Sequence, residues 1–330
     1  MKVLAGDVGG TNTRLALCEV NEGKVLRLVH TIEPSAKHDS LGEIIQEFAS
    51  AHGADDVRAV CIGLPGPVRG RRAQLTNLPW VVDADALERD LGLPSITLLN
   101  DLEANAHGLS TLSDADFMVL REGSPLQGGN AGLVSAGTGL GEAGMHFVRG
   151  ELYPFPTEGG HTDFAPSNEL EWELLQHLRR DHDHVSWERV VSGPGLAAIY
   201  GFLLQRAGAP EPDWWQEAKT AKEPAAAIAA AADGGDEHAD AALDHFLAFY
   251  GAEAGNFALK VLATGGIYLG GGIAPKLANR MKSSRFLERF NGKGRMRHLV
   301  EQIPIRVILN DSAALQGAAL YGAGSARAGA

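Results

Sequence analysis

The chain has 330 residues and 45% of them are apolar, so it is long enough for two domains that each bury a sizeable core. Its 29 basic and 41 acidic residues give a formal net charge of −12, which argues against nucleic acid or an anionic membrane surface as a partner. The two cysteines, Cys18 and Cys61, are too few for a disulfide scaffold or a cysteine-rich zinc module.

Nothing in the sequence predicts export or membrane insertion. The first residues lack the apolar stretch and cleavage pattern of a signal peptide. No window approaches the roughly 18 consecutive apolar residues of a transmembrane helix. Scarce cysteine is typical of a reducing compartment, so we expect a cytoplasmic protein.

The N-terminal segment predicts a β-hairpin. An apolar run at residues 2–5 leads into Gly-Asp-Val-Gly-Gly-Thr-Asn, and residues 13–18 then alternate between polar and apolar. Residues 9–12 are therefore expected to form the turn. A third strand follows at 24–30, and apolar residues at helical spacing predict a helix over 40–52.

The next segments alternate strand and helix. Residues 57–64 and 96–99 have the composition of buried strands, and 102–112 has a helical pattern, which together predict a parallel sheet layer. Asn100 and Asp101 stand where the second of these strands ends. They are explained either as a helix cap, because both residue types are favoured there, or as a ligand site at the carboxyl end of a sheet.

The hairpin pattern then repeats. Residues 131–136 predict a strand, 137–141 a Gly-Thr turn and 142–148 a return strand. Turns of this kind can point backbone N–H groups at a phosphate, although a Gly-rich turn is also an ordinary hairpin connection. Two such turns in one chain favour the phosphate-binding interpretation.

The remainder of the chain is mostly helical. The predicted helices are 168–180, 193–206, 224–236, 241–262 and 313–321. Strands are expected at 267–272, running into a glycine turn, and at 305–309. Residues 324–330 are expected to be frayed.

Three further polar residues stand out. Glu158 and His161 flank a glycine pair, and Glu188 lies in a segment that suggests a helix beginning at Ser186. Taken singly, each is more simply a solvated surface group or a satisfied histidine. Asp7, at the end of the first strand, could orient the water shell of Mg²⁺, which prefers oxygen ligands.

Six motifs in order resemble one known family. They are GDVGGT at 6–11, LNDLEA at 99–104, GTGLG at 137–141, EGGH at 158–161, SWERV at 186–190 and GGGIAP at 270–275. Their order and spacing are similar to those of the bacterial ATP-dependent glucokinase family, from the first residues to about residue 322. Each motif alone is modest, but six in order are specific.

The resemblance implies an α/β fold of the two-domain actin-like (ribonuclease H-like) ATPase type with an interdomain cleft. The smaller domain would comprise 1–110 and 302–330, including the strand at 305–309, and the larger domain would comprise 111–301. The implied activity is ATP-dependent phosphorylation of D-glucose at its 6-hydroxyl, with Mg²⁺ bridging the phosphates, in a chain that we expect to be a homodimer.

The resemblance also implies the roles of individual residues. Asp101 is similar to the catalytic base that accepts the proton of the 6-hydroxyl, and Asn100 to the neighbouring sugar-binding amide. The other sugar-binding residues would be Glu158, His161 and Glu188. The ATP-binding residues would be Gly6, Asp7, Val8, Gly9, Gly10, Thr11, Gly137, Thr138, Gly139 and Gly272, with Asp7 also holding Mg²⁺ through water.

Two alternatives stay open at this stage. One is a kinase for another hexose or an amino sugar, and the other is a non-catalytic sugar sensor of the same fold. A sensor that acts as a repressor needs a DNA-binding helix-turn-helix, which we do not expect ahead of a strand that begins at Lys2. Related kinases and repressors carry a cysteine-rich zinc motif after their histidine, but no cysteine follows residue 61 here, so His161 is not expected to bind zinc.

Overall fold

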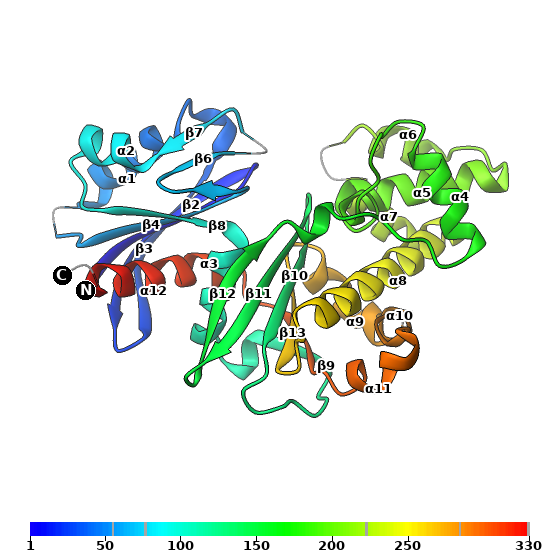
Figure 1. Cartoon of the computed structure of the whole chain (residues 1–330). Helices are drawn as coiled ribbons and strands as arrows, with labels where there is room; N and C mark the ends of the chain where they lie inside the picture. Colours follow the sequence, from blue (N-terminus) through cyan, green and yellow to red (C-terminus); the bar gives the residue numbers. More distant parts are fainter. Residues whose placement is uncertain (55, 76–77, 222–223, 284, 329–330) are drawn as a thin grey trace. The chain divides into compact units, whose positions relative to one another are not determined.

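The computed structural model describes residues 1–330 except 55, 76–77, 222–223, 284 and 329–330 (Figure 1). The chain divides into two compact units. Unit 1 comprises Met1–Asp116, Tyr153–Pro156 and Asn310–Ala330, and unit 2 comprises Phe117–Leu152 and Thr157–Leu309. The sequence predicts that the smaller domain ends at 110 and resumes at 302. In the structure, unit 1 extends to Asp116 and its C-terminal part begins at Asn310.

Unit 1 is built on a five-stranded sheet with the order β3-β2-β1-β4-β8. Its strands are β1 (Lys2–Val8), β2 (Asn12–Asn21), β3 (Lys24–Pro34), β4 (Ala59–Leu64) and β8 (Ile96–Asn100). Strands β1, β4 and β8 are parallel, and β2 and β3 extend the sheet beyond β1 in antiparallel fashion. All six residues of β4 are buried, as expected for a parallel strand that is covered on both faces.

Two helix layers cover the two faces of this sheet. Helices α1 (Leu41–His52) and α2 (Ala84–Leu91) lie against the face that carries Leu4 and Ile62. Helices α3 (Asp101–Gly108) and α12 (Ala313–Ala328) lie against the other face. A small three-stranded sheet of β5 (Val68–Arg69), β6 (Arg72–Gln74) and β7 (Val81–Asp83) completes unit 1 and was not predicted.

Helix α12 corrects the prediction that 324–330 is frayed. The helix continues to Ala328, and residues 329–330 lie outside the described part of the chain. Ala319 and Ala323 are buried in the core beneath the sheet, which holds the last turns of the helix in place. Small residues also let α12 cross α3 closely, because a Cβ on Gly317 would lie only 1.8 Å from the carbonyl oxygen of Ala104.

Most of a six-stranded sheet with the order β12-β11-β10-β13-β14-β9 belongs to unit 2, and only the middle of β12, Tyr153–Pro156, is assigned to unit 1. The strands are β9 (Phe117–Arg121), β10 (Ala131–Ala136), β11 (Leu140–Val148), β12 (Glu151–Thr157), β13 (Gly266–Gly270) and β14 (Ile305–Ile308). The expectation that 305–309 belongs to the smaller domain is wrong. This segment forms β14, which pairs with β13 and β9 and buries Ile305 and Val307 in the core of unit 2.

The helices of unit 2 pack around α8 (Glu237–Lys260), whose second half is almost completely buried. The others are α4 (Glu169–Leu178), α5 (Gly193–Ala207), α6 (Asp213–Ala218), α7 (Pro224–Asp233), α9 (Ala274–Ser283), α10 (Phe286–Asn291) and α11 (Arg297–Val300). Tyr250 and Phe257, two turns apart on α8, both contact β10: the Tyr250 hydroxyl donates to the Val134 carbonyl at 2.9 Å, and the Phe257 ring packs against Gly132. Within the described residues, no helix is long and apolar enough to cross a membrane.

Candidate active site

The glycine turn at 9–12, between β1 and β2, is fixed by hydrogen bonds to Ser35 and has two exposed residues. The Gly9 amide donates to the Asn12 carbonyl at 2.8 Å, closing the turn between β1 and β2. Ser35 binds both sides of it: its hydroxyl donates to the Gly9 carbonyl at 2.8 Å and its amide to the Thr11 carbonyl at 3.0 Å. Gly10 and Thr11 are exposed, so the turn can present backbone N–H groups to an anion.

Asp7 lies just before this turn. Its Oδ2 accepts a hydrogen bond from Arg14 Nη1 at 3.2 Å, and its side chain is only 16% exposed. Burial raises the pKa of Asp7, and the Arg14 guanidinium opposes that shift. The two predicted ATP-binding residues that flank Asp7 have no polar side chain to offer. Val8 is buried, and Gly6 contributes only its backbone to β1.

The pair at the end of β8 divides into two roles. Asn100 is the N-cap of α3, where its Oδ1 accepts from the amides of Leu102 at 3.0 Å and Glu103 at 3.3 Å. Its Nδ2 donates to the Gly66 carbonyl at 3.2 Å. Asp101 is the first residue of α3, and its Oδ1 accepts from the Leu102 amide at 2.9 Å. The capping interpretation is therefore correct for Asn100, and the same contacts fix its orientation.

Asp7 and Asp101 lie at the same edge of the sheet. Asp7 pairs with Gly63 of β4, and Gly63 pairs with Leu99 of β8, so the carboxyl ends of the three parallel strands are aligned. The two residues thus lie at the same edge of the sheet, with β4 between the strands that carry them. A Cβ on Gly63 would lie 3.1 Å from the Cβ of Ala104, which is unusually tight, so the missing side chain lets α3 pack close to β4.

The second glycine turn, in unit 2, lies beside the glycine motif at 270–275, which contains the predicted ATP-binding residue Gly272. The Gly137 amide donates to the Gly139 carbonyl at 2.9 Å, and the Gly137 carbonyl accepts from the Gly193 amide at 2.8 Å. Gly272 N would lie 3.9 Å from a Cβ on Gly137. Gly271 has a φ of +80° and a Cβ there would lie 2.2 Å from the Ala136 carbonyl oxygen, so only glycine fits. The structure therefore brings residues 137–139 and 270–272 together.

The three polar residues of unit 2 gather beside the same turn. Glu188 Oε2 accepts from the Leu140 amide at 3.0 Å and would lie 2.5 Å from a Cβ on Gly139. His161 Nδ1 is 4.0 Å from Glu188 Oε1, and His161 Nε2 is 3.9 Å from Glu158 Oε2. These separations are too long for hydrogen bonds, and the Glu158 and His161 side chains are each 57% exposed. The cluster offers both acceptors and a donor to solvent.

Glu188 does not lie on a helix that begins at Ser186, as the sequence suggested. Ser186 is followed by a single 3₁₀ turn, Trp187–Arg189, and α5 begins only at Gly193. The Ser192 hydroxyl caps α5 and also donates to the Glu188 carbonyl at 2.7 Å, which holds the turn against the helix. The buried side chain of Trp187 anchors the turn in the core.

Comparison with known proteins decides the family. The model of the glucokinase family matches residues 4–325. The chain belongs to the glucokinase family. A glucokinase of Nostoc punctiforme is 43% identical over 340 residues, covering 97% of this chain and 98% of that protein.

Solved structures agree with the glucokinase-family assignment. A crystal structure of glucokinase from an Antarctic psychrotroph has a TM-score of 0.83 and 30% identity, covering 98% of this chain and 99% of that one. A ROK family glucokinase from Streptomyces griseus, in complex with glucose and AMPPNP, has a TM-score of 0.66 and 21% identity, with 98% and 100% coverage. At that identity it shows the fold alone. The predicted fold class, the actin-like sugar-kinase fold, is confirmed.

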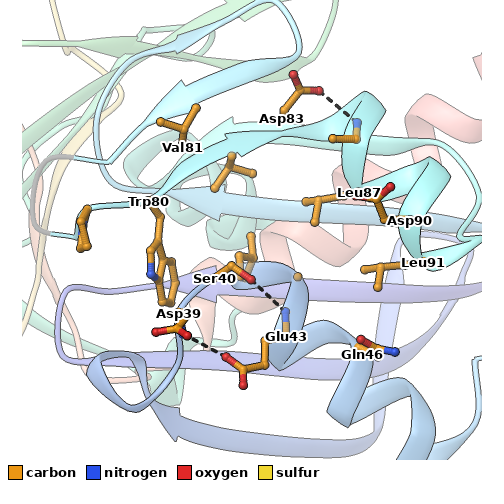
Figure 2. Close-up of a pocket in the computed structure, with 15 residues that line it drawn as sticks. Asp39, Ser40, Glu43, Gln46, Trp80, Val81, Asp83, Leu87, Asp90 and Leu91 are labelled. Carbon is orange, nitrogen blue, oxygen red and sulfur yellow. Dashed lines mark hydrogen bonds between the residues drawn. The ribbon is translucent and has the colours of Figure 1, made fainter.

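A pocket elsewhere in unit 1 of this glucokinase-family chain contains none of the predicted site residues. It lies between α1 and α2, has a volume of about 510 Å³, and is lined in part by Asp39, Trp80 and Asp90 (Figure 2). Glu43 at its rim also belongs, with His38 and Glu47, to a group of three possible metal ligands within 4.8 Å of one another. Exposed acidic groups of this kind are common without a metal.

Two residues with clear positions near the predicted site were not singled out from the sequence. Ser35 fixes the first glycine turn, and it is fully buried beside Thr13, to whose hydroxyl it is 3.0 Å away. Gly63 allows α3 to approach the sheet. A glycine inside a strand is a known sign of a close backbone approach, so Gly63 carried a usable signal. Nothing in the local sequence marks Ser35.

Proposed function

We propose that this chain transfers the γ-phosphoryl group of ATP to the 6-hydroxyl of D-glucose. The observation that carries the proposal is the Glu188 carboxylate, which contacts both the phosphate-type turn at Gly139 and the polar cluster at His161. A polyanion and a polyol could therefore be bound side by side, as a sugar kinase requires. Family membership supports the same reaction.

The nucleotide would be bound mainly by backbone groups. Phosphoryl transfer passes through a loose transition state, so catalysis depends on positioning and on stabilising charge. The turns at 9–11 and 137–139, in which Gly10, Thr11 and Thr138 are exposed, offer amides for the phosphates. Gly272 has open space around its Cα that could admit a nucleoside.

Mg²⁺ is the metal that this site would hold. Asp7 supplies a hard oxygen donor at the edge of the sheet, which is the type of ligand that Mg²⁺ prefers. Because Arg14 already neutralises part of the carboxylate charge, a contact through the water shell of the ion fits better than a direct bond. Bound Mg²⁺ would neutralise charge on the phosphates during transfer.

Asp101 would accept the proton of the 6-hydroxyl. An ordinary aspartate has a pKa of about 3.9, so it is a weak base that takes the proton late and chiefly orients the hydroxyl. Asn100 would bind the sugar with the amide that also caps α3, while Glu158, His161 and Glu188 would bind hydroxyls near carbons 1 to 3. Closure on the sugar would exclude water and limit ATP hydrolysis. A cytoplasmic location and a homodimer stay predictions.

A coupled assay with a panel of sugars and phosphate donors tests the proposal. A site built to hydrogen-bond a hydroxyl penalises an analogue that leaves its partners unmet, by about 1–3 kcal/mol for each partner. We therefore expect kcat/KM for glucose to exceed that for mannose, fructose and N-acetylglucosamine by at least about tenfold each, the low end of that penalty.

The variants E158Q and H161A should reduce this preference and leave the affinity for ATP nearly unchanged. Equal kcat/KM for glucose and N-acetylglucosamine would instead assign the chain to the amino-sugar kinases. Saturable binding of glucose with no phosphorylation by any donor would favour the sensor alternative.

A further inference from the structure

Glu142 is a buried carboxyl group for which the proposed chemistry has no use. It lies on β11, shortly after the second glycine turn, and it is only 1% exposed. Among the described residues, neither of its carboxyl oxygens has a hydrogen-bond partner. Burial of an unpartnered ionised carboxylate is costly, so this position calls for a physical explanation.

On one side, Glu142 contacts the turn that carries two of the proposed sugar ligands. A Cβ on Gly159 would lie 1.9 Å from Glu142 Oε2, so the carboxyl group packs directly against the Gly159 backbone. The Glu142 carbonyl also accepts from Thr157 Oγ1 at 2.8 Å, and that hydroxyl accepts from the Gly159 amide at 3.2 Å. Glu158 precedes Gly159 and His161 follows it in the chain, so contacts with Gly159 affect the positions of both side chains.

On the other side, Glu142 faces α8. Val134, its direct partner on β10, accepts a hydrogen bond from the Tyr250 hydroxyl at 2.9 Å. Glu253, one helical turn after Tyr250, is completely buried, and its oxygens accept from Lys260 Nζ at 3.0 Å and Asn256 Nδ2 at 2.8 Å. Glu253 therefore has its own partners on α8, and it is also the neighbour with which a protonated Glu142 would share a side-chain hydrogen bond.

The charges around Glu142 favour its neutral form. Burial raises the pKa of Glu142 to about 8, the negative charge of Glu253 contributes in the same direction, and the positive charge of Lys260 opposes both. Burial also raises the pKa of Tyr250, which stays a neutral phenol. Lys293, which donates to Asn256 Oδ1 at 2.6 Å, has its pKa lowered to about 8 by burial. The surroundings of Glu142 thus favour its protonated form.

We propose that neutral Glu142 is a positioning residue for glucose, and that its ionisation weakens glucose binding by displacing the turn at 158–161. This inference rests on the proposed function, because it takes Glu158 and His161 as sugar ligands. An ionised Glu142 would be repelled by Glu253 in a poorly polarisable interior. It could relieve that repulsion only by moving toward the turn or by admitting water, and either change shifts Gly159.

The sign of the pH dependence follows from linkage. Glucose binds the neutral form better, so bound glucose raises the pKa of Glu142 further. The full affinity is present below the pKa of the free protein and declines as the pH rises through it. Glucose binding above that pH therefore takes up a proton.

Titration calorimetry of glucose binding from pH 6.5 to 9.5 tests the inference. For the unmodified protein we expect constant affinity below about pH 8 and a decline of up to about tenfold per pH unit above it. E142Q, which is neutral at every pH, should bind within about threefold of the parent at pH 7 and show no decline. E253Q should move the decline to lower pH, because the charge that raises the pKa of Glu142 is removed. The affinity for ATP should not follow this profile in any variant.

Two controls separate the possible outcomes. E173Q alters an exposed glutamate on α4 and should reproduce the parent profile. Thermal melting identifies variants that fail to fold, and the shift in E253Q then provides a test that does not depend on E142Q. An identical decline in the parent and E142Q would overturn the inference, and if E158Q still weakens glucose binding the proposed function stands. Absence of glucose turnover in the parent would instead refute the proposed function.

Discussion

Asp101 stands where β8 passes into α3, and its backbone position is fixed by the Asn100 cap and by the close approach of Gly63. We expect D101N to keep the shape of the side chain and to lose the base. Turnover should fall by roughly 10²–10⁴, the usual contribution of general-base catalysis, while the Kd for glucose changes less than about threefold. A coupled assay gives kcat and calorimetry gives Kd.

The matched control for D101N is D90N, which alters an exposed aspartate on α2 that lines the pocket in Figure 2 and is not among the proposed site residues. This variant should retain full turnover. The assignment of Asp101 as the base fails if D101N keeps more than a tenth of the parent kcat.

Single residues were predictable where the motif itself supplies the chemistry. Glu158, His161 and Glu188 were named from the sequence, and the structure brings them together beside Gly139. Glu142 was not named, because one glutamate in an alternating strand is normally on the solvent face. Its burial depends on α8, a helix more than a hundred residues further along the chain, and no local pattern encodes that contact.

At the scale of elements, the two hairpins were predictable because their turn residues act locally. The strand at 305–309 was also predicted, but it was assigned to the wrong sheet. A short apolar strand does not specify which strands it pairs with, and in the structure it pairs with β13 and β9. The small sheet of β5, β6 and β7 was missed because its strands have only two or three residues. The helical end at 324–328 was missed because a segment rich in Gly and Ala has no apolar periodicity that would predict a packed helix. The burial of Ala323 in the core shows that the helix is packed there.

The crossing of α3 and α12 gives a test at this scale. A Cβ on Gly317 would lie 1.8 Å from the Ala104 carbonyl oxygen and 2.5 Å from the Gly108 amide nitrogen, so G317A must push the helices apart. We expect the free energy of unfolding to fall by about 1–3 kcal/mol, the usual cost of overpacking. Urea unfolding of the full chain, followed by far-UV circular dichroism, measures it.

Gly324 in the same helix is the matched control. A Cβ there would meet nothing within 4 Å. Because alanine has a higher helix propensity than glycine, G324A should raise the free energy of unfolding by about 0.5–1 kcal/mol. If both variants were equally destabilised, α12 would be sensitive to any substitution of glycine by alanine. The close crossing with α3 would then not be the cause.

At the scale of the whole molecule, domain boundaries were less predictable than elements because the chain passes between units more than once. Unit 1 takes residues from three separate stretches, including the short Tyr153–Pro156, and no shift in composition marks these points. The alternation of strands and helices depends on local periodicity and predicted a parallel sheet layer, whereas the two-domain fold class came from the resemblance to the glucokinase family. The boundaries at 110 and 302 depended on long-range pairing, which a single sequence does not reveal.

The net charge of −12 makes the binding of a phosphate polyanion unfavourable for the molecule as a whole. The turns at 9–11 and 137–139 are rich in glycine and contain no basic side chain. Their backbone amides cannot neutralise the phosphate charge, so we expect a bound cation to do so. We expect chelation with EDTA to abolish glucose phosphorylation and added Mg²⁺ alone to restore it fully. Titration of activity against free Mg²⁺ at constant ionic strength measures this requirement. Turnover that persists in excess EDTA, or stoichiometric zinc in the purified protein, would contradict the assignment of Asp7 and Mg²⁺.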